Sequence, residues 1–422
     1  MTALPSGAPP LRGQEPGGGK HIATPPLSER DPLTDPGIPT PELPLAEARS
    51  FEGYISAMPI GPQPAPLSTT GAIGWVRANL FNSVGNTILT FLIGAFAVYM
   101  IYGLVRFALI DATWSGSDRT ACLGKAGACW PMIGERLAYF VYGSYPIDER
   151  WRVDIVFALG AAGLVWVLWL DAPRRDLGAA YFFVVFPIVA FCLLYGFPLI
   201  GLPKVDSDLW GGILVTLVIS SAGIVAALPL GILLALGRRS KLPIVSIVSI
   251  LFIEIARGVP LITVLFVAKV MIGYFIPERL DPSLMVKALI LVALFSAAYM
   301  AEVVRGGLQS IPKGQQEGAS SLGLGYWQSM RLIILPQALR ITIPGIVNTF
   351  IGGFKDTSLV LIIGMFDFLG TIQIATSDAK WATPVSAPTG YLFAALFYWI
   401  CCFGMSRYSR AVEMRLSAAH KR

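Results

Sequence analysis

The sequence predicts an all-α integral membrane protein that crosses a bilayer about eight times. Of its 422 residues, 55% are hydrophobic and only 14% are charged, and the mean hydropathy is +0.65. Soluble domains are about a quarter charged, so this composition already favours a membrane. Apolar runs of the length that a spanning helix needs recur from residue 80 onward. Because every backbone polar group in lipid needs an internal partner, we expect these runs to be helices.

The first segment, residues 1–70, differs from the rest of the chain. About half of the 31 prolines fall between Pro5 and Pro66, and small, polar and charged residues fill much of the remainder. Such a segment cannot bury enough apolar surface to offset the entropy lost on ordering, so we expect it to be disordered. It lacks the basic start and apolar centre of a signal peptide.

Eight apolar runs follow this segment and set the expected topology. They cover residues 84–109, 153–170, 179–201, 211–236, 247–276, 284–304, 342–366 and 389–406. The second run is short, and polar residues interrupt the seventh. Eight spans place both ends of the chain on one side, and the loops of that side hold more Lys and Arg than the opposite loops. The positive-inside bias therefore predicts cytoplasmic N- and C-termini.

Two cysteines, Cys122 and Cys129, share the long loop 111–152, which this topology places outside. Two cysteines so close in sequence can form a disulfide in an oxidising compartment such as the one outside a Gram-negative inner membrane. Two free thiols are the alternative. The chain has only two histidines, both in its polar tails, so we expect no metal site.

The polar loop 305–340, between the sixth and seventh runs, carries the most information about function. It is too polar to span and too long for a simple turn. Pro312 can open a helix at its first turn, and Gly323 can end that helix in a left-handed conformation. A second short helix, over roughly 326–334, would end near Pro336. The pattern predicts a helix-turn-helix on the inner face.

This loop resembles the cytoplasmic signature of the permease subunits of bacterial ABC importers. That signature reads Glu-Ala-Ala, three residues, Gly, nine residues, then Ile-x-Leu-Pro. The residues that match it are Glu317, Gly318, Ala319, Gly323, Ile333, Leu335 and Pro336. Only Gly318 departs from the signature, and an ordinary amphipathic loop would not explain the spacing. The resemblance implies that the first short helix, with Glu317 on its exposed side, docks into an ATPase subunit as a coupling helix.

The sequence around the loop resembles a narrower class, the polar-amino-acid uptake permeases of the histidine and glutamine type. The matching stretches are 216–217, 231–238, 254–261 and 354–359. The resemblance covers about half of the chain and implies a five-helix (MetI-like) core. The Pro-rich start and three additional spans resemble the long, M-type permease subunit of general L-amino-acid importers. The expected regions are a disordered cytoplasmic segment 1–70, three additional helices in 71–205, the core 206–412 and a cytoplasmic tail 413–422.

Four polar residues in the seventh run are candidates for contact with a solute. Charged side chains at membrane depth are costly and by default indicate function. Lys355 can meet the carboxylate of an amino acid and Asp356 its ammonium group, while Thr357 and Ser358 can supply hydrogen bonds. The competing interpretation is that Lys355 and Asp356 pair with each other or with neighbouring helices.

Glu254 and Arg257 form a second group of charges, near the inner end of the fifth run. They are three residues apart and share one helical face. We expect them to form a structural or gating ion pair rather than to touch a solute.

The resemblance implies an inner-membrane permease subunit of an ATP-driven importer that translocates L-amino acids by alternating access. The chain has no Gly-x-x-x-x-Gly-Lys-Ser/Thr loop, so we expect ATP on a separate ATPase, no cofactor on this chain and no enzyme activity of its own. The other expected partners are an external amino-acid-binding protein, a second homologous permease in a heterodimer, and lipid, but not nucleic acid. A secondary transporter driven by an ion gradient is the alternative, although it does not explain the loop 305–340.

Overall fold

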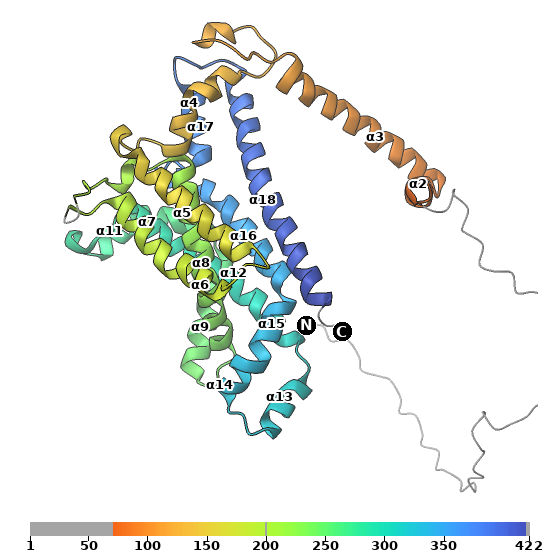
Figure 1. Ribbon diagram of the computed structural model, residues 1–422, viewed down its shortest axis with the longest axis vertical. Helices are drawn as coiled ribbons and strands as arrows, with labels where there is room; N and C mark the ends of the chain where they lie inside the picture. The colour runs from red at the N-terminus through yellow and green to blue at the C-terminus, as the bar shows by residue number, and fades with distance from the viewer. Residues whose placement is uncertain (1–70, 199–200, 419–422) are drawn as a thin grey trace, which may run out of the picture. The chain divides into compact units, whose positions relative to one another are not determined.

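The computed structural model describes residues 71–198 and 201–418. Within these ranges the chain consists of helices and their connections, and extended backbone pairs only in three isolated bridges (Figure 1). The predicted all-α class is therefore confirmed. The disorder predicted for residues 1–70 concerns residues outside the described ranges, as does the end of the predicted tail.

The chain divides into two compact units, residues 1–91 and 92–422. In the described part of the first unit, α2 (Gly71–Leu80) is followed by the beginning of α3 (Val84–Val105). The hydroxyl of Thr90 donates a hydrogen bond of 2.9 Å to the last carbonyl of α2. This bond holds the turn between the two helices.

The second unit contains the remaining helices. Before the predicted core these are η3 Arg106–Ile110, η4 Arg119–Ala121, α4 Trp130–Tyr142, η5 Ile147–Glu149, α5 Arg150–Leu168, α6 Arg175–Ala180, η6 Tyr181–Val185 and α7 Phe186–Tyr195. In the predicted core they are η8 Ser207–Leu209, α8 Gly212–Arg238, α9 Pro243–Gly258, α10 Leu261–Val270, α11 Ile272–Phe275, η9 Glu278–Leu280, α12 Leu284–Ser310, α13 Lys313–Ser321, α14 Tyr326–Ser329, η10 Met330–Ile334, α15 Leu335–Ile341, α16 Ile343–Asp356, η11 Thr357–Ile363, α17 Phe368–Ser377 and α18 Ser386–Ala418.

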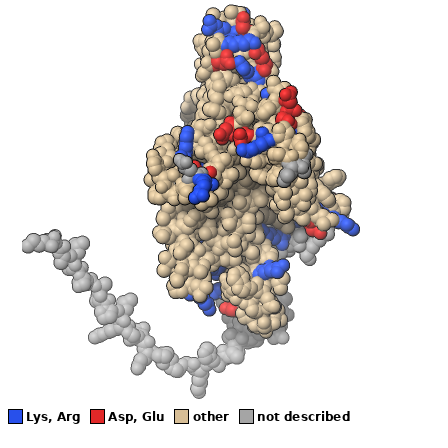
Figure 2. All heavy atoms as spheres, turned by 90° about the vertical axis from the view of Figure 1, so that its left-hand side faces the viewer, with Lys and Arg blue, Asp and Glu red and all other residues tan. Residues whose placement is uncertain are grey.

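Seven stretches of the described chain are long and apolar enough to cross a membrane. They are Val84–Ile110, Ile147–Leu168, Arg175–Tyr195, Gly212–Arg238, Leu284–Ser310, Ile343–Ile363 and Ser386–Leu416. The pair α9 and α10 passes the same test only when both helices are taken together, which gives eight spans if the pair counts as one. On the face that Figure 2 shows, charged side chains gather in a few groups and leave broad areas without charge, as a lipid-facing surface requires.

The fifth expected span, 247–276, is not a continuous helix. α9 ends at Gly258 and α10 begins at Leu261, and the two helices are bent by 100°. Val259 between them is extended, with φ −111° and ψ 136°. Pro260 explains the break, because it lacks a backbone N–H and disfavours helical geometry in the residue before it.

The core is organised around α8 and α12, which form the most extensive helix pair of the described chain. Small residues let the two backbones approach closely. A Cβ at Gly231 would lie 2.7 Å from the side chain of Met300, and one at Gly223 would lie 3.2 Å from that of Val292. Larger side chains at these two glycines would push the helices apart.

The long loop 111–152 contains an ordered element that the sequence analysis did not predict, the cap (residues 111–142). Its helix α4 buries Met132, Ile133 and Phe140 in a cluster with side chains of α17 and α18. The ion pair between Lys380 and Glu135, at 2.6 Å, joins the same two regions. Proline in the first turn of α4 and glycine after its last residue were the sequence signals for this helix.

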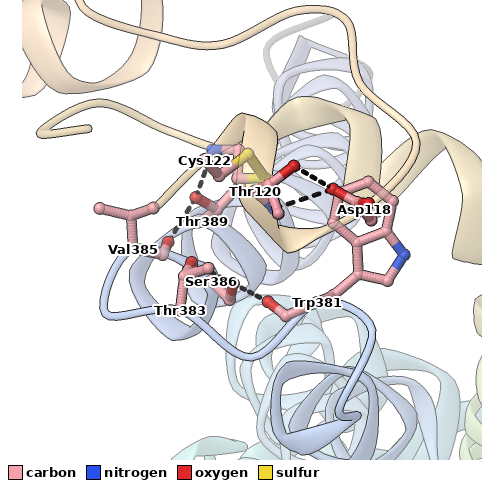
Figure 3. Close-up of a disulfide and its surroundings, with 9 residues drawn as sticks. Asp118, Thr120, Cys122, Trp381, Thr383, Val385, Ser386 and Thr389 are labelled. Carbon is pink, nitrogen blue, oxygen red and sulfur yellow. Dashed lines mark hydrogen bonds between the residues drawn. A yellow bond between two sulfur atoms is a disulfide. The ribbon is translucent and has the colours of Figure 1, made fainter. Parts of the chain in front are cut away.

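The structure joins Cys122 and Cys129 in a disulfide inside the cap. Both cysteines are buried, and the backbone N–H of Cys129 donates a hydrogen bond of 2.9 Å to the hydroxyl of Thr389 in α18. Figure 3 shows the disulfide beside the turn that leads into α18, where the hydroxyl of Ser386 donates to the carbonyl of Trp381. The disulfide thus fixes the cap where it contacts the core.

The end of α4 also meets the start of α8 at a joint that admits only glycine. A Cβ at Gly212 would lie 2.1 Å from the carbonyl oxygen of Phe140, and one at Gly143 would lie 2.3 Å from the Cα of Gly211. Gly212 and Gly143 have φ of +64° and +65°, which other residues rarely adopt. The cap and the first core helix are therefore in backbone contact.

Candidate functional site

The first helix of the loop 305–340 is short and ends in a glycine cap. α13 begins at Lys313, directly after Pro312, and Gly323 follows it with φ +75°. The N–H of Gly323 bonds to the carbonyl of Ser320 at 3.0 Å, and that of Leu324 bonds to the carbonyl of Ala319 at 3.2 Å. These two bonds form a Schellman motif, so the predicted left-handed cap is confirmed.

The second helix of the loop begins at Tyr326, as predicted, but it does not end near Pro336. α14 continues through the π-helical turn η10 into α15, which ends at Ile341. Pro336 lies in the first turn of α15. A π-helical turn shifts the hydrogen-bond pattern by one residue, and a proline in a first turn lacks only an N–H that has no helical partner there. The predicted end of this helix was therefore wrong.

Four of the seven predicted loop residues are exposed, and the other three are buried or partly buried. Glu317, Gly318 and Gly323 are exposed, and a Cβ at Gly318 would meet no atom within 4 Å. Of the remaining four, Ala319 is buried, Ile333 and Leu335 are partly buried and Pro336 is exposed. The side-chain amide of Gln337 also donates to that of Gln315 at 3.1 Å and ties α13 to α15.

Large apolar side chains of this polar loop are exposed. Leu322 and Trp327 expose 78% and 69% of their surface, and Leu332 exposes 65%. Aromatic and aliphatic groups gathered on a polar, exposed surface are typical of a protein contact. The loop therefore combines a rigid exposed helix with apolar groups suited to a partner.

The four candidate residues of the seventh run lie where the helix changes its form. α16 ends at Asp356, and the 3₁₀-helical segment η11 begins at Thr357. Lys355 is exposed, and Asp356 and Ser358 are partly buried. Thr357 is fully buried, and its hydroxyl donates to the carbonyl of Phe354 at 2.9 Å. Lys355 is therefore the most exposed of the four, and the hydroxyls of both Thr357 and Ser358 donate to backbone carbonyls.

Neither Lys355 nor Asp356 forms an ion pair with another described residue. Just before them on α16, a narrow pocket lies between α8, α12 and α16. It is lined by Ser220, Gly223, Ile224, Ala227, Val292, Ser296, Thr349, Phe350 and Gly353. Its volume of about 10 Å³ is roughly the space of one water, so no amino acid fits in this conformation.

Glu254 and Arg257 do not pair with each other, so the expected ion pair is wrong. Arg238 at the end of α8 contacts Glu254 at 2.9 Å, and Arg257 approaches Glu302 at 3.7 Å. At a spacing of three residues the two side chains share a face of α9, but both reach toward charges on other helices. Glu302 was not predicted from the sequence, although an acidic residue at the end of an apolar run was a signal for it.

A second polar cluster that the sequence analysis missed surrounds Asp367. This residue is fully buried and caps α17 by accepting the N–H of Gly370 at 2.9 Å. It also accepts the hydroxyl of Tyr398 in α18 at 3.1 Å. Next to it the hydroxyl of Thr216 in α8 accepts the N–H of Phe368 at 3.0 Å. Burial raises the pKa of Asp367 above its ordinary value despite these bonds.

No group of three or more His, Cys, Asp or Glu suited to a metal ion occurs among the described residues. The candidate groups are the exposed loop 305–340, the charged residues Lys355 and Asp356, and the polar clusters around Glu302 and Asp367.

Comparisons with known proteins connect this architecture to a family. Residues 227–418 match the model of the family described as "Binding-protein-dependent transport system inner membrane component". The "Inner membrane amino-acid ABC transporter permease protein YhdY" of Escherichia coli K12 is 49% identical over 84% of this chain and 96% of its own length.

Two further relatives show how much of the chain is shared. The "Glutamate/glutamine/aspartate/asparagine transport system permease protein BztC" of Rhodobacter capsulatus is 38% identical over 88% of this chain and 100% of its own length. The "Probable glutamine ABC transporter permease protein GlnP" of Bacillus subtilis is 34% identical, over 49% of this chain but 93% of its own length. Shorter relatives thus correspond to about half of this chain.

Proposed function

The chain belongs to the family of binding-protein-dependent ABC transporter permeases, and we propose that it translocates L-amino acids as the permease subunit of an ATP-driven importer. It is a multi-pass membrane protein with seven or eight spans within its described residues. The observation that carries the proposal is the exposed, capped helix α13, which has the spacing of the family's coupling loop.

The partners follow from this function. The exposed face of α13 and the apolar groups beside it (Leu322, Trp327 and Leu332) suit the groove of an ATPase subunit. ATP would be bound and hydrolysed there, since the chain has no phosphate-binding loop of its own. An external amino-acid-binding protein would deliver the solute, and a second homologous permease would complete a heterodimer. The chain would bind no cofactor itself.

We propose a place in the bacterial inner membrane with α13 on the cytoplasmic side. The loop basic residues support cytoplasmic termini if the bent pair α9–α10 counts as one span. The cap with its disulfide would then lie on the opposite, oxidising side, where such a bond is stable.

Lys355 and Asp356 supply the recognition of the solute in this proposal. The ammonium group of Lys355 is exposed and suits a carboxylate, and the carboxylate of Asp356 suits an ammonium group. Contacts limited to these common groups would admit many amino acids. The narrow pocket next to them on α16 would have to widen, which alternating access provides.

The experiment on the loop uses the complex of this chain with its ATPase, its second permease and its binding protein in liposomes. Glu317→Lys should lower both ATPase association and uptake by about tenfold or more, because a charge-assisted contact contributes about 1.5–3 kcal/mol. Gln316→Lys, which adds a charge next to the same position, is the matched control. Unchanged uptake and association in Glu317→Lys would show that this face of α13 does not bind the ATPase.

The experiment on the solute site measures uptake of a panel of labelled amino acids by the same liposomes. Lys355→Ala should lower uptake of all transported amino acids, since it removes the group that meets their shared carboxylate. Lys355→Arg, which keeps the charge, should retain part of the activity. Equal uptake by Lys355→Ala and the wild type would remove this site while leaving the family assignment intact.

A further inference from the structure

Glu302 in α12 is the centre of a five-residue charge cluster, the Glu302 cluster (Arg238, Glu254, Arg257, Glu302 and Arg305). Its carboxylate contacts Arg238 at 2.8 Å and Arg305 at 2.7 Å, and Arg257 lies 3.7 Å away. Only 15% of its side-chain surface is exposed, less than for any other member. Three arginines therefore meet at one carboxylate, whereas Glu254 pairs with only one described arginine, Arg238.

The cluster joins three core helices at the point where α12 leads into the coupling loop. Arg238 is the last residue of α8, and Arg257 lies in the last turn of α9. Glu302 and Arg305 lie in the last turns of α12, which ends at Ser310 just before α13. The Glu302 carboxylate therefore links α12, just before α13, to α8 and α9 by charged contacts, in addition to the packing of α12 against both helices.

The cluster also contains a donor that is shared between two acceptors. A single nitrogen of Arg238, Nη1, contacts Glu302 at 2.8 Å and Glu254 at 2.9 Å. Three guanidinium groups face two carboxylates, so one positive charge has no carboxylate of its own. Side chains partly exposed to water can exchange such contacts at lower cost than buried ones. A shared donor with two acceptors has the properties of an element with two arrangements.

We propose that Glu302 is the positioning residue that couples movement of the coupling loop to α8 and α9. This inference rests on the proposed function and adds to it the link between the ATPase contact and the membrane helices. In one arrangement Arg238 is shared between the two carboxylates, and in the other it stays with Glu254 while α12 moves with α13. Glu302 then sets how much transport each hydrolysed ATP produces.

The test measures uptake and ATP hydrolysis together in the reconstituted complex. Glu302→Gln removes the charge but keeps the size of the side chain. The ratio of solute transported to ATP hydrolysed should fall about two- to thirtyfold, the range by which coupling residues act. ATPase association should stay within about twofold of the wild type, because the coupling helix itself is unchanged. Glu302→Asp should restore part of the ratio.

Glu413→Gln in α18 is the matched control, since Glu413 accepts the hydroxyl of Ser409 at 2.9 Å and has no part in the Glu302 cluster. It should leave the ratio near the wild-type value. If Glu302→Gln does not assemble, Arg257→Gln removes the longest contact of the cluster and should still lower the ratio. Uptake and hydrolysis that fall in parallel, with an unchanged ratio, would overturn the inference in favour of a purely structural role. Failure of the proposed function would appear instead as no ATP-dependent uptake by the wild type.

Discussion

Asp367 and Glu302 are both acidic residues within the helical core, and their surroundings differ in kind. Asp367 is fully buried and accepts hydrogen bonds from neutral donors, the backbone N–H of Gly370 and the hydroxyl of Tyr398. Glu302 is partly exposed and is contacted by the guanidinium groups of three arginines. The first cluster joins α8, α17 and α18, and the second joins α8, α9 and α12.

The cluster around Asp367 is a fixed joint, whereas the Glu302 cluster is an adjustable joint whose side chains can exchange partners. One neutral donor on the backbone and one tyrosine hydroxyl hold the buried carboxylate, and breaking these bonds would leave polar groups unsatisfied in the interior. Long charged side chains near water can change partners without such a loss. α8 takes part in both clusters. Its beginning contacts the fixed cluster through Thr216, and its end contacts the Glu302 cluster through Arg238.

The largest expected effect is at the fixed joint. Asp367→Ala removes the cap of α17 and leaves the hydroxyl of Tyr398 without its acceptor, so the free energy of unfolding should fall by about 3 kcal/mol. Thermal unfolding of the purified protein measures this loss. Asp367→Asn, which can still accept the N–H of Gly370, should lose less. A fully stable Asp367→Ala variant would mean that the two clusters do not differ as described.

Removal of the disulfide in the cap should give the next largest loss of stability, without affecting the coupling of transport to ATP hydrolysis. The double variant Cys122→Ser and Cys129→Ser should lower the free energy of unfolding by about 2 kcal/mol, since the unfolded chain gains freedom when a short loop is opened. The ratio of transport to ATP hydrolysis should not change. A changed ratio would show that the cap takes part in coupling, which would weaken the separation of the two clusters.

A smaller effect concerns pH. The pKa of Asp367 is raised in the folded protein, so the folded state binds the proton of this carboxyl more tightly than the unfolded state does. Protonation therefore adds to the free energy of unfolding at a pH below the unfolded pKa, and this contribution is lost as the pH rises through the raised value. Asp367→Asn cannot titrate there. The difference in melting temperature between the wild type and Asp367→Asn should therefore shift in favour of the wild type as the pH falls into the acidic range. A constant difference would contradict the raised pKa.

The smallest effect is expected on the exposed loop. Gly318→Ala places a methyl group where no atom lies within 4 Å, and it should stabilise α13 by up to about 1 kcal/mol. Uptake should stay at the wild-type level or rise. Exposed Gly314 in the same helix also has open space around it, so Gly314→Ala is a matched control in melting experiments. A selective loss of uptake in Gly318→Ala would show that docking needs this glycine.

The sequence predicted best the features that depend on neighbouring residues. Pro312 before α13 and Gly323 after it are local signals, and the structure follows both. The end of the next helix was missed, because the π-helical turn η10 lets the helix pass Pro336. Residues 258–260, Gly-Val-Pro, indicated a perturbed helix in the fifth run, but the bend of 100° between α9 and α10 could not be read from the sequence.

The two clusters could not be predicted in the same way. Arg238 and Glu302 lie on helices that are far apart in the sequence, and only the packing of α8 against α12 brings them together. The spacing of Glu254 and Arg257 indicated a shared face but not their actual partners. Asp367 resembled an ordinary loop residue, because its burial depends on α18 and the cap. Periodicity indicates which face of a helix is apolar, but not which distant helix supplies a polar partner.

The glycine joint between α4 and α8 limits how this protein can be recombined with its shorter relatives. A side chain at Gly212 would collide with the carbonyl of Phe140, so the start of α8 and the end of α4 must match each other. A chimaera that keeps this core and exchanges the preceding helices would need to keep α4 as well. For protein engineers, the useful crossover point lies before residue 111, where the cap begins, because the cap holds the disulfide and its contact with α18.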